Sequence, residues 1–289
     1  MRSRLLAATL LVLLEAGCRL APTTRPATTA LLATVRAPGV ELEVSCTDAD
    51  SVELGRLSTG LIAAASSVAL WGSFRSRLQV RVLEDHDALE RAVGRPGYSW
   101  LRAWAYGDLV LLQSPRTWEA TTQAQAPDVL ELLTHELTHA LMYQLLEPDD
   151  SPPSWSSGAA LEEPPLWFRE GMASVTAGQG KKRLSPEELR DWLLRHPGKN
   201  PLEPDGELVR TEKEAVYGAA HRAFELLLAR GGDQAIRDVL RGMRSGARFS
   251  DAFAAATGQQ ASTFAAEALR QGFTAAVVDK HPEQGAGGP

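Results

Sequence analysis

The chain has 289 residues, and 44% of them are hydrophobic. That is enough apolar sequence to bury the core of one large domain or of two small ones. The formal net charge of −6 leaves no basic surface of the kind that attracts phosphate backbones, which argues against nucleic acid as a partner.

The first 17 residues have the features of a signal peptide. A basic start, Met1 to Arg4, precedes an apolar run from Leu5 to Leu14 that is too short to span a bilayer. The small pair before Cys18 resembles a bacterial lipobox, in which the cysteine is lipidated, although Glu15 stands where an aliphatic residue is usual. A plain secretory signal is the alternative. Both predict an exported protein, and lipidation at Cys18 would anchor it in the bacterial cell envelope, facing the periplasm or the exterior.

Composition divides the rest of the chain into three parts. Residues 18–37 are rich in Thr, Pro and Ala, which predicts a disordered tether. The folded domain is expected at 38–278, and a loose tail at 279–289. Cys46 is predicted to be a lone thiol if Cys18 carries lipid, whereas an unmodified Cys18 would allow a disulfide between the two.

The first part of the domain, 38–126, predicts a small α/β unit. Period-two alternation and local capping signals give its expected elements: strands at 40–46 and 78–83, helices at 51–71, begun by a Ser51 cap, and 85–93, and a hairpin of strands at 100–106 and 109–112. Trp100, Trp104 and Tyr106 share one face of this hairpin. They are either core residues or one edge of a cleft, where an extended peptide would add as a further strand.

The second part, 127–278, predicts a mainly helical half. Its expected helices are at 128–146, 166–177, 185–196, 212–230, 235–244, 249–256 and 262–278. A loop at 147–163, dense in Pro, Ser and acidic residues, precedes the second of them and could hang over the cleft. Strands that come before helices indicate an α+β fold with the active-site cleft between the two parts.

The helix at 128–146 contains the motif His135-Glu136-Leu137-Thr138-His139. Histidines four residues apart project from one helical face, so a single metal ion can bind both. They lie opposite a predicted core stripe, which consists of Leu130, Leu133, Leu137, Ala140 and Leu141. This H-E-x-x-H spacing is typical of zinc metalloproteases, although two surface histidines on an amphipathic helix would give the same pattern.

A catalytic zinc ion needs a third protein ligand and one open position for water. Glu170 is the candidate, because the next helix would bring its carboxylate back to the histidine face. A solvated glutamate paired with Arg169 is the alternative. The metal would lower the pKa of the water, and Glu136 would accept its proton and pass it to the leaving amine.

With Trp167-Phe168-Arg169-Glu170-Gly171-Met172-Ala173 following the first motif, the sequence resembles the peptidase MA-like gluzincins, relatives of thermolysin. The resemblance implies one Zn²⁺ bound by His135, His139 and Glu170, with Glu136 as the catalytic base. It covers residues from about 78 to 230. Thermolysin-like members carry a carboxylate four residues after the ligand glutamate to orient a zinc histidine. Ser174 stands there in this chain and predicts a weaker hydrogen bond.

Further along, the sequence Tyr217-Gly-Ala-Ala-His221 resembles a tyrosine-containing helix of the same family. Tyr217 and His221 share a helical face. Either could donate a hydrogen bond to the oxyanion of the reaction, and a helix that packs its tyrosine and solvates its histidine is the alternative.

The prediction is therefore a zinc metallopeptidase, of endopeptidase or aminopeptidase type, acting on peptides or proteins of the cell envelope. One alternative is an envelope lipoprotein that keeps the metal for stability or partner binding without turnover. A second alternative is amide hydrolysis of a non-protein envelope polymer.

Overall fold

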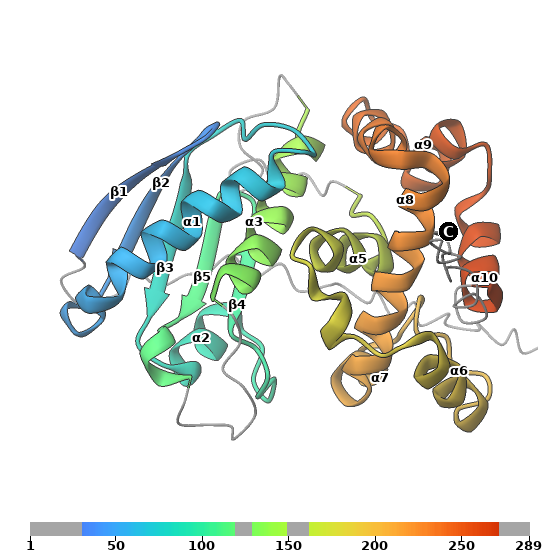
Figure 1. Ribbon diagram of the computed structural model, residues 1–289, viewed down its shortest axis with the longest axis horizontal. Helices are drawn as coiled ribbons and strands as arrows, with labels where there is room; N and C mark the ends of the chain where they lie inside the picture. The colour runs from blue at the N-terminus through green and yellow to red at the C-terminus, as the bar shows by residue number, and fades with distance from the viewer. Residues whose placement is uncertain (1–30, 119–128, 149–161, 272–289) are drawn as a thin grey trace, which may run out of the picture.

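The computed structural model describes residues 31–118, 129–148 and 162–271. In this part of the chain a five-stranded sheet comes first and a mostly helical region follows, with helix α3 between them (Figure 1). This order confirms the predicted α+β class. None of the helices in these ranges is long and apolar enough to cross a membrane.

The sheet has the strand order β1-β2-β3-β5-β4. β2 and β3 are parallel, as are β3 and β5, whereas the two outer pairs are antiparallel hairpins. Gly107, with φ 59°, supplies the positive φ that the tight turn between β4 and β5 needs. β4 is therefore an edge strand. The strands are β1 (Leu31–Ala37), β2 (Val40–Cys46), β3 (Leu78–Leu83), β4 (Ala103–Tyr106) and β5 (Leu109–Gln113).

Most of the predicted helices are present within a few residues of their expected ends. In chain order the α-helices are α1 (Leu54–Val68), α2 (His86–Val93), α3 (Val129–Leu146), α5 (Leu166–Thr176), α6 (Pro186–Arg195), α7 (Gly206–Thr211), α8 (Lys213–Arg244), α9 (Phe249–Thr257) and α10 (Ala261–Gln271). Short 3₁₀ helices lie at η1 (Asp48–Glu53), η2 (Pro115–Thr117) and η3 (Gln179–Lys182).

Alternation along β5 separates the two faces of the sheet. Val110 and Leu112 belong to the main core with α1 and α3, whereas Leu111 packs with Leu89 of α2 on the other face. The main core continues through α3 into the helical region, where Phe168 of α5 is fully buried. α3 is therefore apolar toward both sides, and its polar motif residues lie within a buried helix.

Helices α5 and α8 approach each other closely at Gly171, next to Glu170 in α5. A Cβ at Gly171 would lie 2.5 Å from the Ala220 carbonyl oxygen and 2.6 Å from the Phe224 Cβ. A larger residue would therefore push the two helices apart at this crossing. Because Glu170 precedes Gly171, the close packing of α5 on α8 sets the position of Glu170 in the cleft.

The predicted tether at 18–37 is wrong over its last seven residues. β1 (Leu31–Ala37) pairs with β2 along its whole length through a Pro38-Gly39 turn, in which Gly39 has φ 75°. Proline followed by a glycine with positive φ is typical of a type II turn, so this dipeptide joins a hairpin. The folded region therefore begins before residue 38.

Two smaller expectations are also wrong. Ser51 does not cap α1, because it lies inside η1 and its hydroxyl donates to the Asp48 carbonyl. Leu130 is 42% exposed, since its place in the first turn of α3 lies beyond the main core. The two helices predicted at 212–230 and 235–244 are confirmed as the two parts of α8, which a non-helical residue, Gly232 with φ 62° and ψ −177°, separates by a kink.

Several expectations fall outside the described residues: the signal peptide, lipidation at Cys18, most of the loop at 147–163 and the tail at 279–289. Cys46 is a buried free cysteine in β2.

Candidate metal centre and cleft

Helix α3 places both histidines of the motif on one buried face. The Nε2 atoms of His135 and His139 are 3.1 Å apart, and the residues are 8% and 9% exposed. Thr134 and Thr138 beside them satisfy their hydroxyls by donating to carbonyls one turn back in the same helix. The two imidazoles therefore contact each other at the cleft, whereas the neighbouring threonine hydroxyls are satisfied within the helix.

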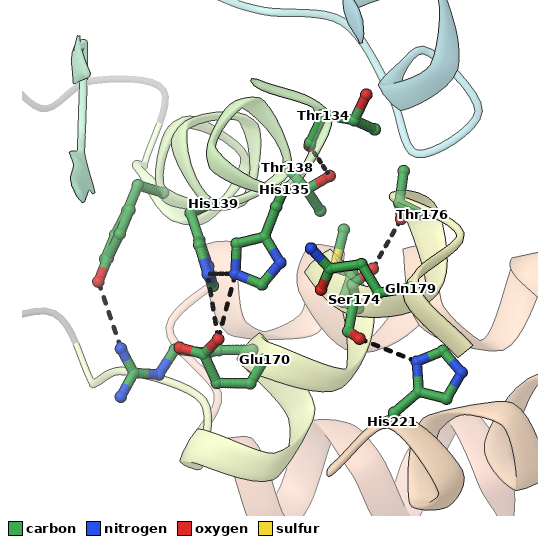
Figure 2. A network of polar contacts seen from close by, with 12 residues as sticks. Thr134, His135, Thr138, His139, Glu170, Ser174, Thr176, Gln179 and His221 are labelled. Atoms are coloured by element: carbon green, nitrogen blue, oxygen red, sulfur yellow. Dashed lines mark hydrogen bonds and ion pairs between the residues drawn. The ribbon is translucent and has the colours of Figure 1, made fainter. Parts of the chain in front are cut away.

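Helix α5 brings Glu170 to the same point (Figure 2). Its Oε2 is 3.3 Å from His135 Nε2 and 3.5 Å from His139 Nε2. Four ligands held 2.0–2.1 Å from a tetrahedral zinc ion lie about 3.3–3.4 Å from one another. The three donor atoms fit that spacing, and two imidazoles with one carboxylate form a donor set typical of catalytic zinc. The chain therefore has a site for one Zn²⁺.

Charge around the site favours a cation. Burial raises the pKa of the Glu170 carboxyl, but the charge and hydrogen bonds of the two histidines outweigh it and hold that pKa well below its usual range. Burial lowers the pKa of His139, and Glu170 and Glu136 raise it further than burial lowers it. The carboxylate is thus anionic and the imidazoles lie in a negative field, which is the environment that a divalent ion needs.

Glu136 follows the first histidine and lines the same cavity, but it is not part of the three-residue cluster. It is 7% exposed, and the Ala105 backbone N–H of the edge strand donates to its carboxylate. Burial raises its pKa, which the two histidines oppose. The side chain thus lies at the cavity wall near β4, with a pKa above its usual range.

A cavity of about 660 Å³ opens in front of these four residues. The strand hairpin forms one wall, and residues of α3, α5, η3 and α8 form the others, so the cavity lies between the sheet and the helical region. Trp100 and Trp104 line it and are half-buried, whereas Tyr106 packs against Tyr143 with ring centroids 5.3 Å apart. Both expectations are therefore met in part: Trp100 and Trp104 line the cavity and also pack against the small core of Leu89, Leu101 and Leu111.

Tyr217 of α8 lines the cavity, but His221 does not. The tyrosine ring packs against Trp100, with centroids 5.8 Å apart, and burial raises its hydroxyl pKa well above the usual range. It therefore keeps its proton as a hydrogen-bond donor. His221 is 2% exposed, so the expectation that it might donate to an oxyanion is wrong.

Ser174 does not contact a metal histidine in the described structure. Its hydroxyl bonds to His221 Nδ1 at 2.9 Å and accepts a hydrogen bond from Arg183 Nε at 3.0 Å. The Nδ1 of His135 is buried without a hydrogen-bond partner among the described residues. The expected support of a zinc histidine by Ser174 is therefore wrong, because one turn of α5 directs the hydroxyl toward α8 instead (Figure 2).

The sequence reasoning missed several polar residues of the cavity wall, among them Gln179 and Arg183. Both belong to η3 or its C-terminal end, and the side chain of Arg183 donates to Gln179 Oε1. The run of three basic residues at 181–183 was the available signal, but it does not reveal which of them turns inward.

Three solved peptidase structures are similar to this chain. Legionella pneumophila aminopeptidase A, solved with aspartic acid, aligns with 82% of this chain at 15% identity and a TM-score of 0.50. An M1 zinc metallopeptidase from Deinococcus radiodurans aligns with 90% at 16% identity and a TM-score of 0.45. An aminopeptidase N family protein from Idiomarina loihiensis aligns with 82% at 14% identity and a TM-score of 0.40.

The first of these likenesses establishes the fold. The chain shares the fold of the matched region of the Legionella enzyme. It spans only 27%, 54% and 41% of the three solved chains, so it matches one portion of each. No protein-family model matches the sequence, and neither does any curated protein.

Proposed function

We propose that this chain is a zinc-dependent metallopeptidase that hydrolyses peptide bonds in the cleft between the sheet and the helical region. The observation that carries the proposal is the cluster of His135, His139 and Glu170, whose donor atoms lie 3.1–3.5 Å apart beside an open cavity of about 660 Å³. A purely structural metal site would have a fourth protein ligand and no cavity. The open cavity therefore favours turnover over the non-catalytic alternative.

The zinc ion, Glu136 and Tyr217 would have separate roles in hydrolysis. A bound zinc ion supplies Lewis-acid chemistry, which polarises a carbonyl and acidifies a water. Glu136, held by the Ala105 N–H, accepts the proton of the attacking water and returns it to the leaving amine. Tyr217 keeps its proton and donates a hydrogen bond to the developing oxyanion.

The edge strand β4 offers a way to hold an extended peptide. It forms one wall of the cavity, and no further strand of the described residues pairs with its outer edge. A peptide that adds to this edge would place successive carbonyl groups along the wall that ends at Glu136. Trp100 and Trp104 would then pack against its side chains.

The test is a peptide library assay with the zinc-loaded protein. We expect cleavage that a chelator abolishes and that zinc restores. Glu136→Gln should bind zinc in a 1:1 ratio and lose at least a hundredfold in kcat. Glu187→Gln, the same change on an exposed residue of α6, is the matched control and should retain wild-type kcat.

Full activity of Glu136→Gln would refute the role of Glu136 as the base. Stoichiometric zinc without cleavage of any peptide would favour the binding module, or hydrolysis of a non-protein amide polymer.

The proposed location is the bacterial cell envelope, with Cys18 as lipid anchor. The basic and apolar start of the sequence supports it. Metabolic labelling with a lipid precursor, compared between the wild type and Cys18→Ala, tests the anchor directly, and an unlabelled wild-type protein would refute it.

A further inference from the structure

Among the described residues, Arg183 lacks the carboxylate partner that Lys182 and Arg169 of the same cleft have. Lys182 pairs with Glu131 at 2.6 Å, and Arg169 pairs with Glu163 at 3.0 Å. Arg183 lines the same cavity, yet no carboxylate in the described part of the chain lies within 4.0 Å of its guanidinium. Its positive charge is therefore still available to a ligand.

Neutral groups hold this guanidinium in a fixed position. Its Nε donates to Ser174 Oγ at 3.0 Å, and Nη2 donates to Gln179 Oε1. Its central carbon lies 5.4 Å from the centroid of the Tyr217 ring, at cation–π distance. A guanidinium has five N–H groups, and these two contacts use only two of them. A positioned fork with unused donors is suited to bidentate recognition of a carboxylate.

A chain of contacts to helix α8 fixes the Ser174 hydroxyl that anchors Arg183. Because Ser174 Oγ accepts from Arg183, its own hydrogen points to His221 Nδ1, 2.9 Å away. On the other side of the same ring, His221 Nε2 lies 3.3 Å from Glu225 Oε1. Contact with His221, followed by the hydrogen bond from Arg222 Nη1 at 2.7 Å, lowers the pKa of Glu225 to about 2. The Glu225 carboxylate is therefore anionic and paired with Arg222, not with Arg183. Figure 2 shows Ser174 and His221 in contact beside the metal ligands.

Arg183 is therefore a positively charged side chain at the cavity wall that no carboxylate of the described residues neutralises. Burial lowers its pKa, whereas Glu170 raises it, acting from beyond hydrogen-bond distance. A bound zinc ion would take up the charge of Glu170 and leave the guanidinium more exposed to an incoming anion. A half-buried guanidinium without a paired carboxylate loses hydration free energy, and an ion pair with a ligand carboxylate would offset that loss.

We propose that Arg183 determines substrate specificity by binding a carboxylate of the peptide next to the scissile bond. The proposal rests on the proposed peptidase function. Two features of a peptide can supply this group: the side chain of an Asp or Glu residue, or the free carboxylate at the C-terminus. Both present the same planar anion to the guanidinium, so the experiment separates them with different peptides.

The experiment compares three sets of peptides with one core sequence. The first set is neutral and capped at both ends. The second is capped and carries one Asp or Glu at each position in turn, and the third is neutral with a free C-terminal carboxylate. We expect the wild type to cleave one of the two acidic sets with a kcat/KM about 10- to 100-fold above the neutral capped set, as a charged hydrogen bond would give.

Variants assign this preference to the guanidinium. Arg183→Gln should bring the ratio of acidic to neutral kcat/KM close to one, and Arg183→Lys should keep part of it. Lys182→Gln removes the same charge from the neighbouring position and is the matched control, with the wild-type ratio. Ser174→Ala keeps the cation but removes one anchor, so a smaller fall in the ratio is expected even if Arg183→Gln folds poorly.

A binding measurement separates this proposal from the peptidase function. Calorimetry with zinc-loaded Glu136→Gln protein should give tighter binding of the preferred acidic peptides, and the double variant with Arg183→Gln should lose that difference.

Equal cleavage and binding of acidic and neutral peptides would overturn the specificity role and leave the peptidase function standing. If no peptide is cleaved, the peptidase function fails, and the calorimetric difference still decides whether Arg183 binds carboxylates. An equal fall in Lys182→Gln would assign the preference to general charge and also overturn the proposal.

Discussion

Gly171 controls the position of a metal ligand without being one, and we expect Gly171→Ala to weaken both the fold and the site. The added Cβ would lie 2.5 Å from the Ala220 carbonyl oxygen and 2.6 Å from the Phe224 Cβ. Favourable contacts of this kind are about 3.5 Å, so α5 and α8 must separate by roughly 1 Å. Overpacking of this size costs about 1–3 kcal/mol of unfolding free energy.

The same shift reaches the metal site, because Glu170 precedes Gly171 in α5. Its carboxylate would move relative to the two histidines of α3, whose donor atoms lie 3.3 Å and 3.5 Å from it. Zinc coordination tolerates only about 0.2 Å of error in bond length. We therefore expect a lower zinc affinity in addition to the lower stability.

Urea unfolding of the metal-free protein measures the first effect, and competition with a zinc chelator measures the second. Gly55→Ala in α1 is the matched control, because nothing lies within 4 Å of its added Cβ. That variant should be as stable as the wild type or more stable by up to about 1 kcal/mol. If Gly171→Ala unfolds at the wild-type urea concentration and binds zinc equally well, the close helix crossing does not position Glu170.

Two further predictions concern metal and pH. A hundredfold excess of zinc over its dissociation constant should stabilise the wild type by about 2.7 kcal/mol, seen as a higher Tm, and Glu170→Gln should show a smaller rise at the same zinc concentration. The pKa of Glu225 is lowered from 4.5 to about 2, so its contacts stabilise the fold above pH 4.5 and this contribution is lost as the pH falls toward 2. Glu225→Gln should therefore lose less stability than the wild type across that interval, and equal acid unfolding curves would contradict the role of this carboxylate.

Local patterns were sufficient to predict the elements that carry the site. The strands at 40–46 and 78–83 have the predicted bounds, because alternation of apolar residues reports directly which face of a sheet is buried. The histidine face of α3 follows from helical periodicity in the same way. β1 was missed because the Thr, Pro and Ala composition of the preceding segment concealed a short strand and its Pro38-Gly39 turn.

Side-chain contacts between different helices could not be predicted from the sequence. Ser174 has the spacing of a residue that supports a zinc histidine, but its hydroxyl turns toward His221 of α8, 47 residues away in sequence. The inward position of Arg183 depends on that same hydroxyl and on Gln179 at the end of η3. Periodicity describes one helix at a time, so it gives the face of a side chain and not its partner on another helix.

The polar face of α3 is explained more simply by a metal than by packing. His135 and His139 lie in a helix that is buried toward both the sheet and the helical region, where unpaired polar groups are costly. Their Nε2 atoms are 3.1 Å apart and both point at Glu170, so a protein without metal must satisfy three buried ionisable groups with protons alone. One divalent cation neutralises the carboxylate and accepts both imidazole lone pairs at once. Helical periodicity places the histidines away from the core, and the Gly171 contact brings Glu170 to them, so the fold assembles the site from two independent packing constraints.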